Sequence, residues 1–273
     1  DFQFRPRPTI SLSDVAFTLR KEDRPTFIRI GRVSTEIGPL SVWRGHVARV
    51  QATDLDIRVP PRSGDAKPSR REGKVETDVI GDRLDATNAT LTLERSDPER
   101  EPLVFDIHEL SLEHVGMGRQ MPFSAVLTNP VPRGRVTTSG LVGPWDPQDP
   151  TGIALSGEYA FELVNLGTLP GIGGGLNSTG KYAGILTAID VEGEATTPDF
   201  NLDLGGRPLP LTATFRAKVD GSDGSTVLEH VEAKLRDTPM RVTGRVDNLP
   251  GPGRRHIVLD TEIESGRIED ILE

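Results

Sequence analysis

Two glycine-containing segments of this 273-residue chain carry residue types that could bind a phosphate or a cation. Gly175–Lys181 matches the first seven positions of a phosphate-binding loop, in which backbone amides and a lysine hold the phosphates. Tyr182 stands where that loop requires Ser or Thr, and the following residues predict a strand instead of the helix that the loop must open. Asp220–Gly224 resembles the start of a calcium loop but lacks the third alternate oxygen ligand and the distal glutamate. We therefore expect no nucleotide site at 175–181 and a hairpin turn at 220–224.

The other side chains that could act in catalysis or bind a metal form no recognisable pattern. The chain has no cysteine, which excludes disulfides, thiolate metal sites and cysteine nucleophiles. Five histidines are scattered, without a His-x-x-x-His pair: His46, His108, His114, His230 and His256. We expect no catalysis, no metal and no cofactor. A carbohydrate-active β enzyme stays open as an alternative, and it requires two of the 41 Asp and Glu to converge in one cleft.

The elements that must position any site read as strands. The clearest is Leu209–Val219, where apolar and polar side chains alternate strictly, so that one face of the strand is apolar and the other wet. Shorter alternation of the same kind occurs at Leu55, Ile57 and Val59, at Ala89, Leu91 and Leu93, at Phe105 and Ile107, at Leu110 and Leu112, at Ile189 and Val191, and at Phe200, Leu202 and Leu204. Gly and Pro turn signals separate these runs, and the chain contains 29 Gly and 22 Pro. The sequence therefore predicts an all-β fold.

Helical signal is confined to two short stretches, residues 165–171 and 266–273, and neither could cover a sheet. Residues 60–74 combine three prolines with basic residues and predict an exposed loop. Two units, which start near Arg135 and Arg241, share the order strand, Gly/Pro turn, strand and short helical turn. They predict a repetitive β structure of which the second unit is cut off at Glu273, with residues 1–273 as one continuous elongated segment.

The net charge of −9 argues against a nucleic-acid partner, because such proteins present a basic field. No apolar run is long enough to span a bilayer. Since the chain begins at Asp1 and not at Met, we expect it to be a processed or excised piece, with any anchor upstream. Residues 1–74 are basic and the remainder acidic, which is compatible with an end near anionic lipid headgroups.

The ordered succession of six segments resembles the AsmA-like proteins of bacteria with two membranes: Gly140–Trp145, Ile153–Phe161, Asn165–Gly174, Ser178–Gly184, Glu192–Phe200 and Leu211–Gly221. The resemblance covers about residues 26–273. It implies an elongated, twisted antiparallel β-sheet that forms an open half-pipe with an apolar inner face. It also implies a periplasmic location, an N-terminal anchor in the inner membrane, and phospholipid acyl chains that slide toward the outer membrane.

On this basis we expect a section of a lipid-conducting groove, with phospholipids and outer-membrane components as partners. The expected lining residues are those whose side chains point to the apolar inner face of the strands: Leu209, Leu211, Phe215, Val219, Phe105, Ile107, Leu202 and Leu204. Apolar contacts are non-directional, so acyl chains could slide along such a face without any catalytic residue. The alternative is a structural or assembly factor for outer-membrane biogenesis, in which a closed β-sandwich buries the apolar face and leaves no lipid conduit.

Overall fold

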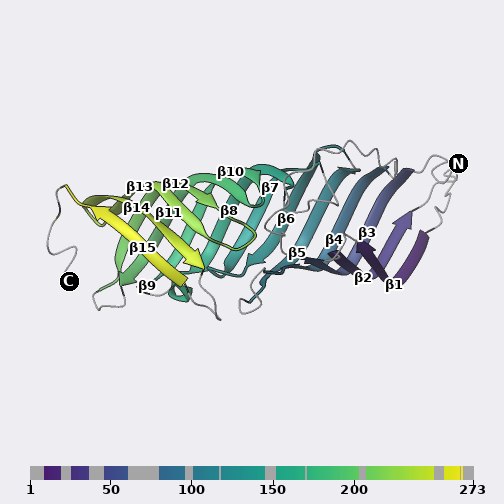
Figure 1. Cartoon of the computed structure of the whole chain (residues 1–273), viewed down its shortest axis with the longest axis horizontal. Helices are drawn as coiled ribbons and strands as arrows, with labels where there is room; N and C mark the ends of the chain where they lie inside the picture. Colours follow the sequence, from purple (N-terminus) through teal and green to yellow (C-terminus); the bar gives the residue numbers. More distant parts are fainter. Residues whose placement is uncertain are drawn as a thin grey trace, which may run out of the picture.

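The computed structural model describes residues 9–19, 26–36, 46–60, 80–95, 101–116, 118–144, 152–169, 171–202, 207–248, 255–264 and 266. These residues form one sheet of 15 strands (Figure 1). The first eight strands are β1 Thr9–Leu19, β2 Thr26–Glu36, β3 His46–Val59, β4 Ile80–Leu93, β5 Leu103–Val115, β6 Met121–Asn129, β7 Gly134–Val142 and β8 Ala154–Asn165. The remaining strands are β9 Ile172–Gly173, β10 Gly175–Ile185, β11 Ala188–Leu202, β12 Leu209–Val219, β13 Thr226–Leu235, β14 Thr238–Asn248 and β15 Arg255–Glu262.

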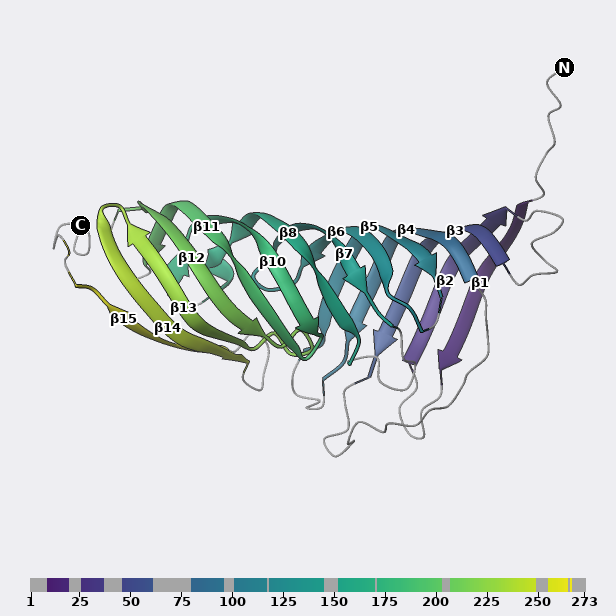
Figure 2. The ribbon, with the colours of Figure 1, turned by 90° about the horizontal axis from the view of Figure 1, so that it is seen from above.

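The strands pair in chain order from β1 to β15, except that β8 pairs directly with β10 and the short β9 pairs with the end of β11. All neighbouring pairs are antiparallel apart from β3 and β4, which run parallel. A parallel pair needs a crossover, and the crossover here contains the loop predicted at 60–74, which apart from Pro60 lies outside the described residues. The sheet is long, twisted and not closed into a barrel (Figures 1 and 2). The prediction of an open, all-β half-pipe is confirmed.

The register places most of the apolar side chains on one face of the sheet, with exceptions such as Val104, Leu141 and Val227 on the other face. Directly paired residues share a face, so one row of partners can be followed across the strands. From β5 to β14 this row is Ile107, Leu127, Val136, Phe161, Ser178, Ala195, Ala213, Ala233 and Met240. We call the side that carries these residues the inner face and the opposite, charged side the outer face. Strand β12 has the bounds that its alternation predicts, Leu209–Val219.

A row of bends and bulges crosses the first five strands, and on β5 the pairings with β4 and with β6 both skip His108. Asp14 in β1, Asp54 in β3 and Asn88 in β4 have φ values of 54°, 56° and 55°, a left-handed conformation that Asp and Asn tolerate better than most residues. On β2 the pairings with β1 and with β3 both skip Gly31. A Cβ at Gly31 would lie 2.9 Å from the Cβ of Asp54, so only glycine fits there without a shift. The Asn88 side-chain amide donates a hydrogen bond of 2.5 Å to Asp54 Oδ1, which ties two of these bends together.

The bent strands pack their inner-face side chains against one another. Five of these residues form a buried cluster: Ala52, Leu55, Ala86, Ala89 and Ile107. Partly buried aliphatic side chains surround it, among them Ile30 in β2 and Leu127 in β6. Around β3 to β5 the inner face therefore behaves as a hydrophobic core.

The predicted helical turn at 165–171 is found as η2, a single 3-10 turn at Leu166–Thr168. Asn165 begins it, because its side-chain oxygen accepts a hydrogen bond from the Gly167 amide at 2.9 Å. The second helical stretch lies outside the described residues except for Gly266. The two expected repeat units start within β7 and β14, and each is followed by an antiparallel partner, β8 and β15.

Candidate functional site: the inner face of the sheet

From β12 to β14 the inner face is an accessible apolar surface. Burial alternates residue by residue in β12, where the inward side chains are half-buried, apart from the buried Ala217, and the outward ones are exposed. Phe215 pairs with Val231 in β13, and Val231 pairs with Val242 in β14, so these three side chains lie side by side. In the described part of the chain every strand belongs to one sheet, and no second sheet faces these residues.

The structure places five of the eight expected lining residues near this accessible region. Leu209, Leu211, Phe215 and Val219 all lie on the inner face of β12 and are half-buried. Leu202, at the end of β11, pairs with Ile172 of β9 and is 45% exposed. A role of these residues in lipid binding stays a prediction.

The other three expected residues lie elsewhere. Phe105 and Ile107 are on the inner face of β5, within the bent part of the sheet. Ile107 is only 9% exposed because the neighbouring aliphatic side chains cover it, so it offers little surface to an acyl chain. Leu204 lies outside the described residues.

Between these regions, two tyrosines lie flat on glycines of the inner face. Tyr159 in β8 pairs with Gly180 in β10, which in turn pairs with Gly193 in β11. A Cβ at Gly180 would lie 2.9 Å from the Tyr159 ring, and one at Gly193 would lie 2.6 Å from its hydroxyl oxygen. The ring therefore extends from its own strand across the next two. Tyr182 in β10 reaches in the opposite direction, across Gly157 of β8.

The hydroxyl groups of both tyrosines are held by threonine and serine. The Tyr182 hydroxyl lies 2.7 Å from Thr138 Oγ1, which donates its own proton to the Glu158 carbonyl at 2.8 Å. A threonine hydroxyl has one proton, so the tyrosine is the donor in this pair. The same logic makes Tyr159 the donor to Ser178 Oγ, at 3.1 Å, because Ser178 Oγ donates to the Glu194 carbonyl. The polar groups of this stretch are thus mutually satisfied within an apolar face.

Burial raises the pKa of both Tyr159 and Tyr182, while their hydrogen bonds to Ser178 and Thr138 act in the opposite direction. Both phenols consequently stay neutral at physiological pH. Sequence reasoning missed this arrangement, because the glycines meet the tyrosines only through the strand register. The sequence did contain one signal: Gly157, Gly180 and Gly193 each stand inside a segment that otherwise has the pattern of a strand.

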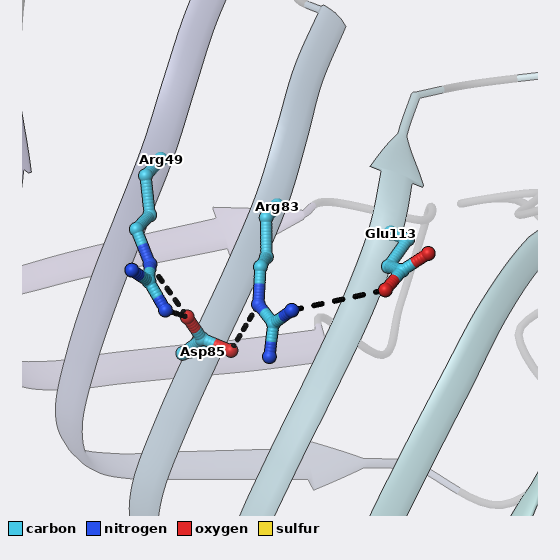
Figure 3. Close-up of polar contacts among 4 residues, drawn as sticks. All are labelled: Arg49, Arg83, Asp85 and Glu113. Carbon is cyan, nitrogen blue, oxygen red and sulfur yellow. Dashed lines mark hydrogen bonds and ion pairs between the residues drawn. The ribbon is translucent and has the colours of Figure 1, made fainter.

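The outer face carries the charges. Over β3 to β5, Asp85 accepts hydrogen bonds of 2.8 Å from both Arg49 and Arg83, and Arg83 reaches Glu113 at 3.7 Å (Figure 3). Burial acts to raise the pKa of Asp85, but the hydrogen bonds from Arg83 and Arg49 outweigh it and hold the pKa below its usual value. The hydrogen bond from Arg83 to Asp85 is the main cause that raises the pKa of the guanidinium.

The outer face also contains a shallow depression of about 790 Å³ that crosses β4 to β10. Small side chains make its floor, including Ser111, Ser124 and Ser139 in one paired row. Ion pairs stand at its two ends, Arg83 with Asp85 and Lys181 with Glu158. Its lining carries two positive and three negative side chains, because Glu109 adds a charge that neither ion pair balances.

Neither of the two glycine-containing segments has the structure of the binding loop that its sequence resembles. Gly175–Lys181 forms the first part of strand β10 and opens no helix. Asp220–Gly224 connects β12 to β13 as the expected hairpin turn. Its two carboxylates are used locally, because Asp220 accepts from the Ser222 amide at 2.8 Å and Asp223 accepts from the Ser225 amide at 2.7 Å.

Among the described residues, no group of three or more His, Asp or Glu could hold a metal ion. Nor does that part of the chain contain a helix of the length and apolarity needed to cross a membrane. Comparison with family models, with curated proteins and with solved structures finds no match to this chain. The inner face is accordingly the one feature from which a function can be argued.

Proposed function

We propose that the inner face binds the acyl chains of phospholipids and lets them move along the sheet between two membranes. The observation that carries this proposal is the apolar face itself, which the register keeps continuous from β1 to β15 and which is only half-buried from β12 to β14. A soluble protein rarely leaves so large an apolar surface exposed without something to bind there.

The energetics of transfer favour an acyl chain as the occupant. Each CH₂ group that leaves water contributes about 0.8 kcal/mol, so a chain that follows several strands is held firmly by many weak contacts. Apolar contacts with a row such as Phe215, Val231 and Val242 are non-directional. The binding energy of an acyl chain therefore changes little from one position along the row to the next. The chain can therefore be held tightly and still slide.

The flat tyrosines make the middle of the face continuous with both ends. Tyr159 and Tyr182 present ring faces, and their hydroxyls are already paired with Ser178 and Thr138. An acyl chain that passes this stretch breaks no hydrogen bond. The stretch therefore adds no large desolvation barrier to sliding.

The biological setting follows from the resemblance to AsmA-like proteins. On that resemblance the chain is a periplasmic section of a bridge that is anchored in the inner membrane, and lipid headgroups travel in solvent along its open side. This function needs no catalytic residue and no cofactor. It needs only that the inner face stay apolar along its length.

The test is to extract the purified chain with organic solvent and to identify co-purified lipid by mass spectrometry. We expect phospholipid in a fixed ratio to protein, retained through gel filtration. A chain that is folded by circular dichroism, carries no lipid and takes none up from phospholipid vesicles would contradict the proposal.

A further inference from the structure

The strand ends and turns along each long side of the sheet form a rim. One turn of the C-terminal part contacts the opposite rim. Leu186, in the turn between β10 and β11, packs against the buried residues Val59, Leu93 and Leu103. Those three residues form one paired row at the end of β3, the end of β4 and the start of β5. They are 6%, 3% and 5% exposed, although they lie at the ends of their strands.

The two contacting groups are remote along the sheet. Between β5 and β10 lie β6, β7 and β8. Because antiparallel strands alternate in direction, the start of β5 lies at one rim, and the turn between β10 and β11 lies at the other. The contact therefore joins the two rims across the concave side, in keeping with the strong twist of the sheet in Figure 2. We call this contact of Leu186 with Val59, Leu93 and Leu103 the seam.

The turn that carries Leu186 is tied to its neighbour on the same rim, because the Gly221 amide donates a hydrogen bond of 2.8 Å to the Leu186 carbonyl. Two arginines show that the rims approach each other at a second place. Burial lowers the pKa of Arg255, at the start of β15, and the positive charge of Arg95, just after β4, lowers it further. Arg95 belongs to the first rim and Arg255 to the second, so the rims approach each other at these residues as well.

The seam is made of side chains. In the described part of the sheet no strand pairing joins the two rims, so the closure lacks the backbone hydrogen bonds that would lock a barrel. Its apolar part depends on one leucine side chain from a turn. A contact of this kind can open without breaking any strand pairing.

We propose that the seam is a lateral opening through which an acyl chain reaches the inner face from the side. This inference rests on the proposed function, and it adds the site at which the lipid is admitted. When Leu186 moves away, Val59, Leu93 and Leu103 become an apolar strip at the rim, which an acyl chain can cover while its headgroup stays in solvent. The seam then closes again behind the chain.

The test uses the absence of cysteine from the chain, which makes introduced thiols unique. Leu186→Cys is combined with Leu93→Cys, or with Leu103→Cys if the first pair folds poorly, and the protein is oxidised or treated with a short thiol crosslinker. Uptake of a pyrene-labelled phosphatidylcholine from vesicles of phosphatidylethanolamine and phosphatidylglycerol is followed by fluorescence. We expect the crosslinked protein to lose most of the initial uptake rate and the reduced protein to recover it.

The control pair is Leu186→Cys with Val104→Cys, since Val104 neighbours Leu103 but is 39% exposed on the outer face. It should neither crosslink nor lose uptake. Failure of both inner pairs to crosslink would show that the rims do not meet, and crosslinking with unchanged uptake would show that lipid is admitted elsewhere. Either result overturns the inference and leaves the proposed function intact. If even the parent chain takes up no lipid while the inner pair crosslinks, the proposed function fails and the seam remains only a structural contact.

Discussion

The inner face differs between the bent part of the sheet, β2 to β5, and the open part, β12 to β15. In the bent part, a cluster that includes Leu55 and Ile107 is 9% exposed or less. In the open part, Leu259 in β15 is 48% exposed, and the inward side chains of β12 are mostly half-buried. Both parts have the same alternating pattern. The two-residue repeat of a strand thus determines which side chains share a face, and the local bend determines whether that face is a core or a binding surface.

The same buried charge should have opposite consequences in the two parts, and the largest effect is expected in the bent part. Leu55→Glu puts a carboxylate among side chains that leave it no route to water, and 6% of the residue is exposed. We expect a loss of unfolding free energy on the order of 3–5 kcal/mol, measured by urea unfolding followed by circular dichroism. The control is Gln51→Glu on the outer face of the same strand, which should change stability by less than about 1 kcal/mol. Equal stability of the two variants would mean that the bent part is not a core.

In the open part, the matched change should affect lipid and spare the fold. Phe215→Glu puts a charge where an acyl chain must pass, but the carboxylate can reach water because Phe215 is half-buried and uncovered. We expect the variant to fold with nearly parental thermal stability and to lose most of its bound phospholipid, measured by mass spectrometry of an extract. Arg216→Glu, one residue along and on the outer face, should change neither property. Unfolding of the Phe215 variant would indicate a closed core here too, and a folded variant with parental lipid would remove Phe215 from the conduit.

The tyrosine stretch lies between the two parts, and its hydroxyls should contribute modestly. Tyr182→Phe removes a donor, but Thr138 Oγ1 keeps its bond to the Glu158 carbonyl, so no buried group is orphaned. We expect a loss of about 0.5–1.5 kcal/mol in unfolding free energy and unchanged lipid content. Gly180→Ala is the sharper comparison, because its Cβ would overlap the Glu192 carbonyl oxygen, and it should destabilise more than Tyr182→Phe. The reverse order would mean that the glycines are not required for the flat packing of the rings.

How far the sequence predicted this structure depends on the bulges. Alternation predicts β12 to the residue, because nothing interrupts Leu209–Val219. In β8, strict alternation from Leu155 would also turn Leu163 inward, yet it adopts a φ of 53° and is 83% exposed, while Val164 takes the inner position with 0% exposure. A bulge shifts the phase by one residue, and it is set by the pairing with β10. No local pattern reveals it.

The sequence likewise predicts one part of the candidate site and not another. The lining residues of β12 could be predicted from the sequence, because alternation within a single strand determines which of its side chains share a face. The packing of Ile107 and the seam at Leu186 could not, because both depend on how far the whole sheet coils. The bends at Asp54 and Asn88 have positive φ values, and the sequence does not tell which of the many Asp and Asn residues in the strands adopt that conformation.

The smallest expected effect concerns the outer face, where both parts should behave alike. Over the bent part, Asp85 is paired with Arg49 and Arg83, and over the open part Asp190 lies 3.4 Å from Lys218. The basic side chains of these pairs are 44–50% exposed, and pairs screened by solvent in this way contribute about 0–1 kcal/mol. Asp85→Asn and Asp190→Asn should therefore each cost little at neutral pH. Neither should change lipid content, because both side chains are on the far side of the sheet from Phe215.

The stability that Asp85 contributes should depend on acid. The pKa of Asp85 is lowered in the folded protein, so its contribution is fully present above the pKa that it has in the unfolded chain, about 3.9, and is lost as the pH falls through the lower folded value. Asp85→Asn removes this contribution at every pH. The stability difference between the parent and Asp85→Asn should therefore stay constant from neutral pH down to about pH 4 and shrink as the pH falls further, as measured by urea unfolding at a series of pH values. A difference that stays constant or grows as the pH falls below this value would show that the pairs with Arg49 and Arg83 do not stabilise the ionised form, and that the outer charges over the bent part serve solubility alone.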